Sequence, residues 1–461
     1  MPALILAALL AAAPDESGSP GPAAAAERPN VLLILSDDQA WDDYGFMGSP
    51  LAHTPHLDRL AGQSLTFPRG YVPTSLCRPS LASILTGQYP HQHGITGNDP
   101  AVPRNVERLP THRNRTPAYL DLRRSMNDTL DDAPKLSALL RDAGYRTLQT
   151  GKWWEGDPKD HGFTAAMTHG DLTRGGRHGD VGLQITRDGQ PTPGLGPLPA
   201  FMQHAENEGQ PWFVWYAPFL PHTPHDPPAR LLTKYQPAVE AGDLTPSEAK
   251  YFANVERFDE AVGAVLAEVD RRDAADPDGP GTLVVYVCDN GWITLPGRSA
   301  YAARSKRSPH EGGVRTPIML RRTGVIEPAR NDTPVSSIDL ARTILHHCDV
   351  PVPEAMGGVN LLDDAALADR GPVFGEIFEH DQPFPAPAAD GLMYRWVVDG
   401  NWKLILPYQP HYTAARGGVP PVELFDLSAD PHETKNLASA NPAEVARLTA
   451  LLDAWWDPTQ K

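Results

Sequence analysis

Residues 30–38 read NVLLILSDD. The apolar run at 31–35 is typical of a strand buried on both faces of a parallel sheet, because such strands lack polar alternation. A second run of this kind, at 283–287, is followed by Asp289 and Asn290. Open α/β sheets place their sites beyond the carboxyl ends of their strands. These stretches therefore predict an α/β fold whose site is built from residues that follow two buried strands.

Helical patterns alternate with strands along most of the chain. The clearest lies at 250–272, where apolar residues recur at helical spacing, and shorter ones lie at 137–142 and 338–347. Further strand-like runs are found at 145–150 and 212–216. Strands that alternate with helices predict a large, mostly parallel sheet flanked by helices.

The chain changes character after residue 349. Prolines and glycines at 351–358 break the pattern, and from residue 371 come short strand-like pieces, at 372–378, 394–398 and 402–406. Asp399-Gly400 between the last two is a hairpin turn signal, and a helix is expected at 442–455. We expect a smaller C-terminal α+β subdomain with an antiparallel sheet over 371–461.

Composition limits the classes of function. The chain has 461 residues and is 41% hydrophobic, so it can build a sizeable core. Its formal net charge of −17 disfavours nucleic-acid binding. An anionic substrate would need a local positive cluster, which two segments offer: 174–180, with Arg177 and His178, and 304–307. Three cysteines do not make a disulfide framework.

Residues 1–28 form a leader of low complexity. The apolar run at 4–13 is about as long as the core of a signal peptide, although no Lys or Arg precedes it. It is too short to span a bilayer as a helix, and no other stretch is long and apolar enough. We therefore expect a periplasmic or secreted protein without a membrane span. A disordered, Ala/Pro-rich leader is the alternative.

Oxygen ligands follow both buried strands. Asp37 and Asp38 come after the first, and Asp289 and Asn290 after the second. Carboxylate and amide oxygens without clustered His or Cys favour Ca²⁺ or Mg²⁺ over Zn²⁺. The alternative is that Asp37 and Asp38 only cap a helix.

A helix is also expected directly after Cys77. Residues 75–87 read SLCRPSLASILTG, in which Pro79 suits a first helical turn and Gly87 a helix end. Cys77 would then lie at a helix N-terminus, which favours anions and lowers the pKa of a thiol. The alternative is a small buried hydrophobic residue.

Together these segments resemble the sulfatase family of the alkaline phosphatase-like fold. The resemblance spans nearly the whole chain, in order, and implies a catalytic domain over 29–350. The segments that carry it are 28–38, 77–80, 85–87, 89–91, 151–153, 221–225, 289–291, 311–317 and 424–433.

The resemblance implies a nucleophile and a metal. Cys77 would be oxidised to formylglycine by a maturation enzyme, and the hydrated aldehyde would attack sulfur. The implied cofactor is Ca²⁺, with Mg²⁺ possible. Its ligands would be residue 77 together with Asp37, Asp38, Asp289 and Asn290.

The resemblance also implies how a sulfate ester is held. Lys152 and Lys306 would bind the sulfate oxygens and stabilise their developing charge. His222 would contact the ester and help to protonate the leaving oxygen. Arg177 and His178 are further candidates for binding the substrate.

Two residues depart from the family pattern. Leu81 stands where the maturation motif usually has Arg, and an arginine occurs at Arg78 instead. Trp154 stands where the family commonly has a histidine that helps to deprotonate the diol. Candidates for a substitute base are His91, His93 and His178.

The implied substrate is a sulfate ester, small or glycan, and a sulfated carbohydrate is favoured. Trp153, Trp154 and Trp292 either stack on a sugar ring or pack in the core. Two alternatives remain: a phosphate or phosphonate ester hydrolase of the same fold, and a catalytically silent member that binds anions.

Overall fold

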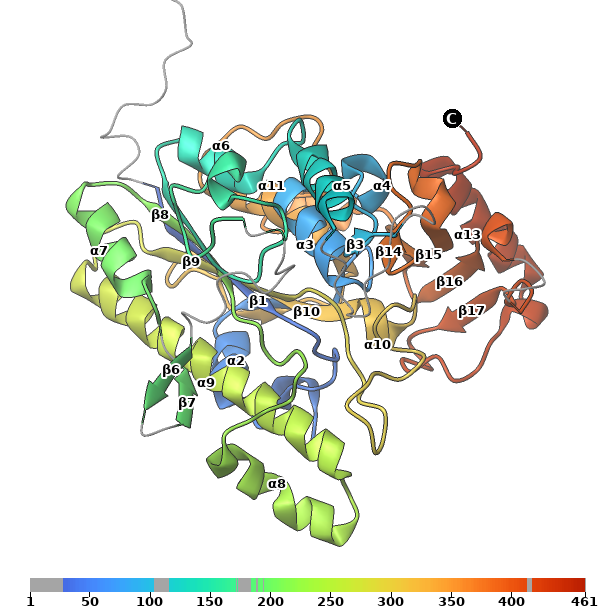
Figure 1. Ribbon diagram of the computed structural model, residues 1–461, viewed down its shortest axis with the longest axis horizontal. Helices are drawn as coiled ribbons and strands as arrows, with labels where there is room; N and C mark the ends of the chain where they lie inside the picture. The colour runs from blue at the N-terminus through green and yellow to red at the C-terminus, as the bar shows by residue number, and fades with distance from the viewer. Residues whose placement is uncertain are drawn as a thin grey trace, which may run out of the picture.

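A large twisted sheet forms the centre of the computed structural model, which describes residues 28–102, 116–170, 172, 184–187, 190–193, 195–412 and 417–460 (Figure 1). Its strand order is β11-β2-β10-β9-β1-β8-β4-β5, with β12 beside β2. The central strands are parallel, as predicted. They are β1 (Asn30–Ser36), β4 (Arg146–Gly151), β5 (Ala165–Ala166), β8 (Trp212–Ala217) and β9 (Thr282–Cys288).

One side of this sheet departs from the parallel pattern. β10 (Arg315–Arg321) runs antiparallel to both β9 and β2 (Leu65–Tyr71). Two short strands then pair with β2, namely β11 (Ala329–Arg330) and β12 (Val335–Ser336). The sheet is thus mostly parallel but has an antiparallel strand next to the site-bearing β9.

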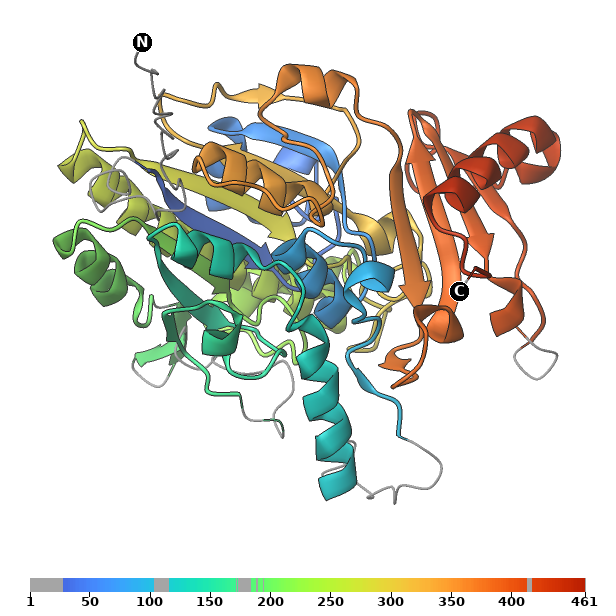
Figure 2. The same ribbon diagram turned by 90° about the horizontal axis from the view of Figure 1, so that it is seen from above.

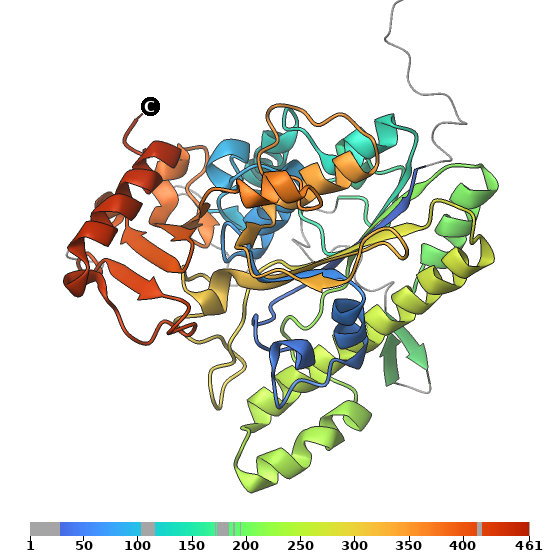
Figure 3. The same cartoon turned by 180° about the vertical axis from the view of Figure 1, so that it is seen from behind.

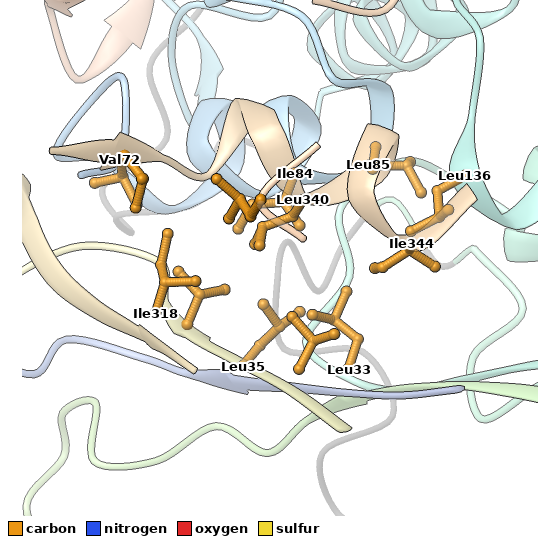
Figure 4. Close-up of a cluster of buried hydrophobic side chains, with 14 of the residues drawn as sticks. Leu33, Leu35, Val72, Ile84, Leu85, Leu136, Ile318, Leu340 and Ile344 are labelled. Carbon is orange, nitrogen blue, oxygen red and sulfur yellow. The ribbon is translucent and has the colours of Figure 1, made fainter. Parts of the chain in front are cut away.

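Side chains of β1 alternate between two cores, which explains its continuous apolar sequence. Leu33 and Leu35 pack on one face, against α3, α6 and α11 (Figure 4). Leu32 and Ile34 pack on the other face, against α2, α7 and α9. The bounds are α2 (Pro55–Gly62), α3 (Cys77–Thr86), α6 (Leu136–Asp142), α7 (Leu198–Asn207), α9 (Pro246–Ala275) and α11 (Ile338–His347).

Further helices, 3₁₀ turns and two short strand pairs complete the described structure. The other helices are α4 (Pro90–His93), α5 (Pro117–Asn127), α8 (Ala229–Ala241), α10 (Glu311–Val314) and α12 (Asp364–Ala368). Short 3₁₀ turns lie at Gly45–Met47, Asp128–Leu130, Pro158–His161, Ala388–Gly391, Gln409–His411 and Ala438–Ala440. Two-stranded pairs join β6 (Gln184–Arg187) with β7 (Gln190–Pro193), and β3 (Asp99–Pro100) with β14 (Asp381–Gln382).

A small antiparallel sheet follows near the C-terminus, as predicted (Figure 2). Its order is β13 (Val373–Phe378), β15 (Leu392–Asp399), β16 (Trp402–Pro407) and β17 (Glu423–Asp426). Helix α13 (Pro442–Trp455) covers its outer face (Figure 3). Leu448 and Leu452 of this helix belong to one hydrophobic cluster with Leu404. Its inner face, with Trp396, belongs to the same hydrophobic cluster as the large sheet. The small sheet is therefore packed onto the catalytic framework by continuous apolar contact.

Within the described part of the chain, no helix has both the length and the apolar character needed to cross a membrane.

Candidate active site

The carboxyl ends of β1 and β9 bring four polar residues together. The two strands are parallel neighbours, with Ser36 in register with Cys288, so the residues after them meet. The backbone N–H of Asp38 donates to Asp289 Oδ1 over 3.2 Å, and Asn290 Nδ2 donates to Asp38 Oδ1 over 2.6 Å. Asp38 has a φ of 64°, a left-handed conformation that turns the chain sharply out of the strand.

Two buried lysines balance these carboxylates. Lys152 follows β4 and places Nζ 2.5 Å from Asp37 Oδ1 and 2.9 Å from Asp289 Oδ2. Lys306 donates to Asp38 Oδ1 over 2.6 Å and to Cys77 Sγ over 3.1 Å. Buried charges persist only when paired, so each lysine keeps its charge through these contacts. Lys152 thus pairs with Asp37 and Asp289, and Lys306 pairs with Asp38.

Cys77 is the first residue of α3 and lies inside the same cluster. Its Sγ lies 3.9 Å from Asp37 Oδ1, and the side chain is buried. The helix begins and ends as predicted, with Gly87 as a left-handed cap. The expected lowering of the thiol pKa is wrong, however. Burial raises the pKa of Cys77, and the two lysines do not overcome the loss of solvation.

His222 reaches the cluster from the loop after β8. The backbone N–H of Asp37 donates to the Leu220 carbonyl over 3.0 Å, which holds this loop against the end of β1. His222 Nδ1–H donates to the Thr223 carbonyl over 2.6 Å, so the other nitrogen, Nε2, faces Asp38 Oδ2 at 3.5 Å. Burial lowers the pKa of His222 to about 3, although the Asp38 carboxylate opposes this shift.

The cluster contains oxygen atoms that fit a divalent cation. Asp37 Oδ2, Asp38 Oδ2 and Asn290 Oδ1 are buried and accept no hydrogen bond from any described residue. Ligand atoms of Asp37, Asp38, Cys77 and His222 also lie within 4.8 Å of one another. Buried oxygens without partners are costly, and oxygen sets of this kind suit hard cations.

The pKa values of the three carboxylates shift in different directions. Burial raises the pKa of Asp289 to about 6, and it also raises the pKa of Asp37. Burial acts on Asp38 in the same direction, but Lys306 and His222 outweigh it and lower its pKa to about 2. Asp38 is therefore the carboxylate that stays charged most firmly.

Several predicted site residues lie elsewhere. His91 pairs with Glu376 at 2.9 Å and stacks on Trp456, whereas His93 bonds to Ser83 Oγ over 3.0 Å. Both rings therefore have partners around α4, and a role of either as a substitute base stays a prediction. Arg177 and His178 lie outside the described residues.

The predicted aromatic and basic residues divide between core and site. Trp153 and Trp292 are buried among other aromatic rings, which favours the alternative that these two rings pack in the core. Trp154 is half-buried, and its ring centroid lies 5.2 Å from Lys152 Nζ. Of the segment 304–307, Lys306 enters the cluster while Arg304 turns toward Glu423.

The arginine next to Cys77 has a partner that sequence reasoning missed. Arg78 donates to both carboxylate oxygens of Glu155, over 2.8 and 2.6 Å, and to Asn127 Oδ1 over 2.8 Å. Glu155 follows Lys152 by three residues, so this pair ties the start of α3 to the lysine-bearing loop. Leu81 packs in the hydrophobic core. No local pattern in the sequence signals the Arg78–Glu155 pair.

Comparison with known proteins agrees with this geometry. The family model described as Sulfatase matches residues 29–350, and the one described as N-sulphoglucosamine sulphohydrolase, C-terminal, matches 301–454. Arylsulfatase A from Bos taurus is 28% identical, over 90% of this chain and 84% of that protein. Human N-sulphoglucosamine sulphohydrolase is 28% identical, over 92% of this chain and 88% of that protein.

A solved structure shares the fold. Ps i-CgsB superimposes with a TM-score of 0.69 at 23% identity, and the match covers 94% of each chain. The family model extends over well more than half of the chain, and its match includes both strand ends, the helix of Cys77 and both lysines. The chain belongs to the sulfatase family, with the alkaline phosphatase-like fold that the sequence predicted.

Proposed function

We propose that this chain is a sulfuric ester hydrolase that removes sulfate from a sulfated carbohydrate. The observation that carries the proposal is Cys77 in contact with Lys306, beside an Asp37 that Lys152 binds, at a set of unpartnered buried oxygens. Two ammonium groups in a buried site can bind the anionic sulfate group of an ester, and the helix N-terminus at Cys77 adds to the positive potential.

A divalent cation fits the unpartnered oxygens, and we assign it as Ca²⁺, with Mg²⁺ as the alternative. Residue 77 and four oxygen-bearing side chains would hold it: Asp37, Asp38, Asp289 and Asn290. Such a cation supplies Lewis-acid polarisation of the bound sulfate. The lysines already in contact with these carboxylates hold them in place around the site.

Residue 77 is proposed to act as formylglycine rather than as cysteine. Its raised thiol pKa leaves the sulfur protonated at neutral pH, and a protonated thiol is a poor nucleophile. A maturation enzyme, using an external oxidant, would oxidise the Cβ and break its bond to sulfur, and the aldehyde left behind would add water to give an oxygen nucleophile. Lys306, within 3.1 Å of the sulfur position, would stabilise negative charge on that oxygen.

The remaining residues bind the ester and move a proton. Lys152 and Lys306 reach the site from different segments and would contact sulfate oxygens that gain charge in the transition state. His222 has its Nδ1 proton committed to Thr223, so only Nε2 can deliver a proton to the leaving oxygen. Negative charge on a bound ester would favour protonation of Nε2.

The substrate class, the localisation and the domain bounds complete the proposal. A sugar substrate is supported by similarity to human N-sulphoglucosamine sulphohydrolase and by the second family model. We propose a periplasmic or secreted protein with a leader at 1–28, a catalytic domain at 29–350 and a C-terminal subdomain at 371–461. Arg177 and His178 stay predicted substrate contacts.

The test is mass spectrometry of the peptide containing Cys77, from protein made with and without a formylglycine-generating enzyme. We expect an aldehyde in the first preparation, and hydrolysis of 4-nitrophenyl sulfate that tracks the aldehyde content. Cys77→Ala should abolish the activity, whereas Cys348→Ala, which removes a buried thiol at the end of α11, should keep it.

Three outcomes would overturn the proposal. An intact, alkylatable thiol in active protein would exclude formylglycine. Hydrolysis of a phosphonate monoester without any release of sulfate would assign the chain to the phosphoryl-transfer alternative. Anion binding without turnover, in protein that carries the aldehyde, would identify a silent member.

A further inference from the structure

A pocket of about 430 Å³ opens beside the loop that carries His222. It lies between this loop, the first turn of α9 and the loop at 297–299. Its volume falls within the roughly 300–1,000 Å³ of small-molecule sites. The lining residues are His225, Pro246, Ser247, Lys250, Gly297 and Ser299, and we call it the His225 pocket.

His225 is a buried polar side chain without a partner. It is 8% exposed, and neither ring nitrogen has a hydrogen-bond partner among the described residues. Its ring is held by aromatic contacts, with centroids 5.4 Å from Tyr251 and 5.6 Å from Trp292. A neutral imidazole offers one donor and one acceptor, and leaving both unused when they are buried is unfavourable. A ligand with hydroxyl groups would satisfy them.

A cationic side chain, that of Lys250, lines the pocket. Lys250 is exposed and forms no ion pair or hydrogen bond with any residue that the structure describes. It lies in the second turn of α9, a helix of 30 residues whose positive end faces this side. The nearby Glu248 carboxylate is occupied in capping the helix, where it accepts from the backbone N–H of Thr245 over 2.8 Å. In a chain with a net charge of −17, an unpaired lysine at a pocket favours an anion.

The His225 pocket adjoins the candidate active site through Trp292. The ring centroid of Trp292 lies 6.0 Å from Lys306 Nζ and 5.6 Å from the ring of His225. His222 and His225 also share one loop, three residues apart. One indole ring therefore separates Lys306 from the His225 pocket, so the group most able to enter the pocket is the sugar next to the one whose sulfate lies at the lysines.

We propose that the His225 pocket binds the sugar residue next to the sulfated one and selects a neighbour that carries its own anionic group. His225 and the serines bind its hydroxyl groups, and Lys250 binds its carboxylate or second sulfate. This inference rests on the proposed function, since it names the substrate class of the same site.

Calorimetry on the Cys77→Ala background tests it without turnover. The probes are N-acetylgalactosamine 6-sulfate, chondroitin 6-sulfate disaccharide, and the same disaccharide with its carboxyl reduced. We expect the disaccharide to bind more tightly than the monosaccharide. Lys250→Ala should raise the dissociation constant of the disaccharide about tenfold and leave that of the monosaccharide unchanged. Lys250→Arg should restore it, and the reduced disaccharide should not respond to either change. A disulfated disaccharide without a uronate then shows whether a sulfate serves as well as a carboxylate.

Two further variants test the role of the His225 nitrogens and provide a matched charge control. His225→Phe keeps a ring against Trp292 and Tyr251 but removes both nitrogens, and should weaken disaccharide binding about fivefold. Arg271→Ala removes a cation from the opposite end of α9 and should leave both dissociation constants at the parent value. Equal affinity for monosaccharide and disaccharide, or a Lys250→Ala effect no larger than that of Arg271→Ala, overturns the inference. Hydrolysis of 4-nitrophenyl sulfate by the unmutated protein tests the proposed function separately.

Discussion

The Arg78–Glu155 ion pair should couple the position of Cys77 to that of Lys152. Arg78 is the second residue of α3, and Glu155 belongs to the loop after Lys152. The side chains are 1% and 5% exposed and are joined by two hydrogen bonds. The perturbation is a double-mutant cycle of Arg78→Met, Glu155→Leu and the two together.

The expected magnitudes follow from burial. Arg78→Met leaves a buried carboxylate without its cation, which costs about 3–5 kcal/mol of unfolding free energy. Glu155→Leu leaves a buried guanidinium and should cost about as much. The double variant removes both charges and loses only the hydrogen bonds to Asn127 and to the Asn98 carbonyl, about 1 kcal/mol each. The coupling free energy, the sum of the two single losses less the loss in the double variant, should therefore be about 4 kcal/mol or more.

Urea unfolding, monitored by tryptophan fluorescence, gives the unfolding free energy. The kcat for 4-nitrophenyl sulfate reports whether the candidate active site keeps its geometry. At temperatures well below the unfolding transition, we expect Arg78→Met to lower kcat. The ion pair that positions residues 77 and 152 relative to each other is then lost. Arg370→Met is the control, since it breaks a pair with the buried Asp339, at 2.6 Å, away from the cluster. It should lower stability but preserve kcat. Additive free energies in the cycle, or equal kcat losses for Arg78→Met and Arg370→Met, would refute the reasoning.

Three other predictions address the charges of the molecule. Lys306→Ala should lower kcat more than it raises KM, because its charge matters most as sulfate oxygens gain charge; steady-state kinetics decide this, and an effect on KM alone would contradict it. Calcium at about 100 times its dissociation constant should raise the unfolding free energy of chelator-treated protein by about 2.7 kcal/mol, measured from its unfolding curve. Stoichiometric zinc in elemental analysis would contradict the calcium assignment. Burial raises the pKa of Asp259 to about 7, above its unfolded value of 3.8, so the folded state binds more protons between these values. The contribution of Asp259 to the unfolding free energy should therefore fall by about 1.4 kcal/mol per pH unit between these values, and should level off above pH 7. The difference in pH slope between the unmutated protein and Asp259→Asn measures this contribution, and an equal slope in the two proteins would exclude it.

Segment patterns were sufficient to predict the main elements. The apolar run at 31–35 lies within β1, and the helical pattern at 250–272 lies within α9. The turn signal at Asp399-Gly400 joins β15 and β16. In each case the pattern depends on residues close together in the chain, because helical periodicity, two-sided burial and turn geometry are local properties. The order of the motifs along the chain then sufficed to identify the family.

Tertiary structure alone decided how these elements meet. Nothing local to β10 indicates that it runs antiparallel beside β9. Arg78 finds Glu155 at a separation of 77 residues, and His91 turns to Glu376 across 285 residues. Such pairs depend on which loops the sheet brings together.

Burial also reversed one local expectation. A helix N-terminus by itself lowers the pKa of a thiol, but Cys77 is enclosed on every side, and its pKa rises. The sequence alone determined that Cys77 begins a helix, because capping and periodicity act over a few neighbouring residues. Only the folded structure decided its protonation, because solvation is set by every segment that packs around the sulfur.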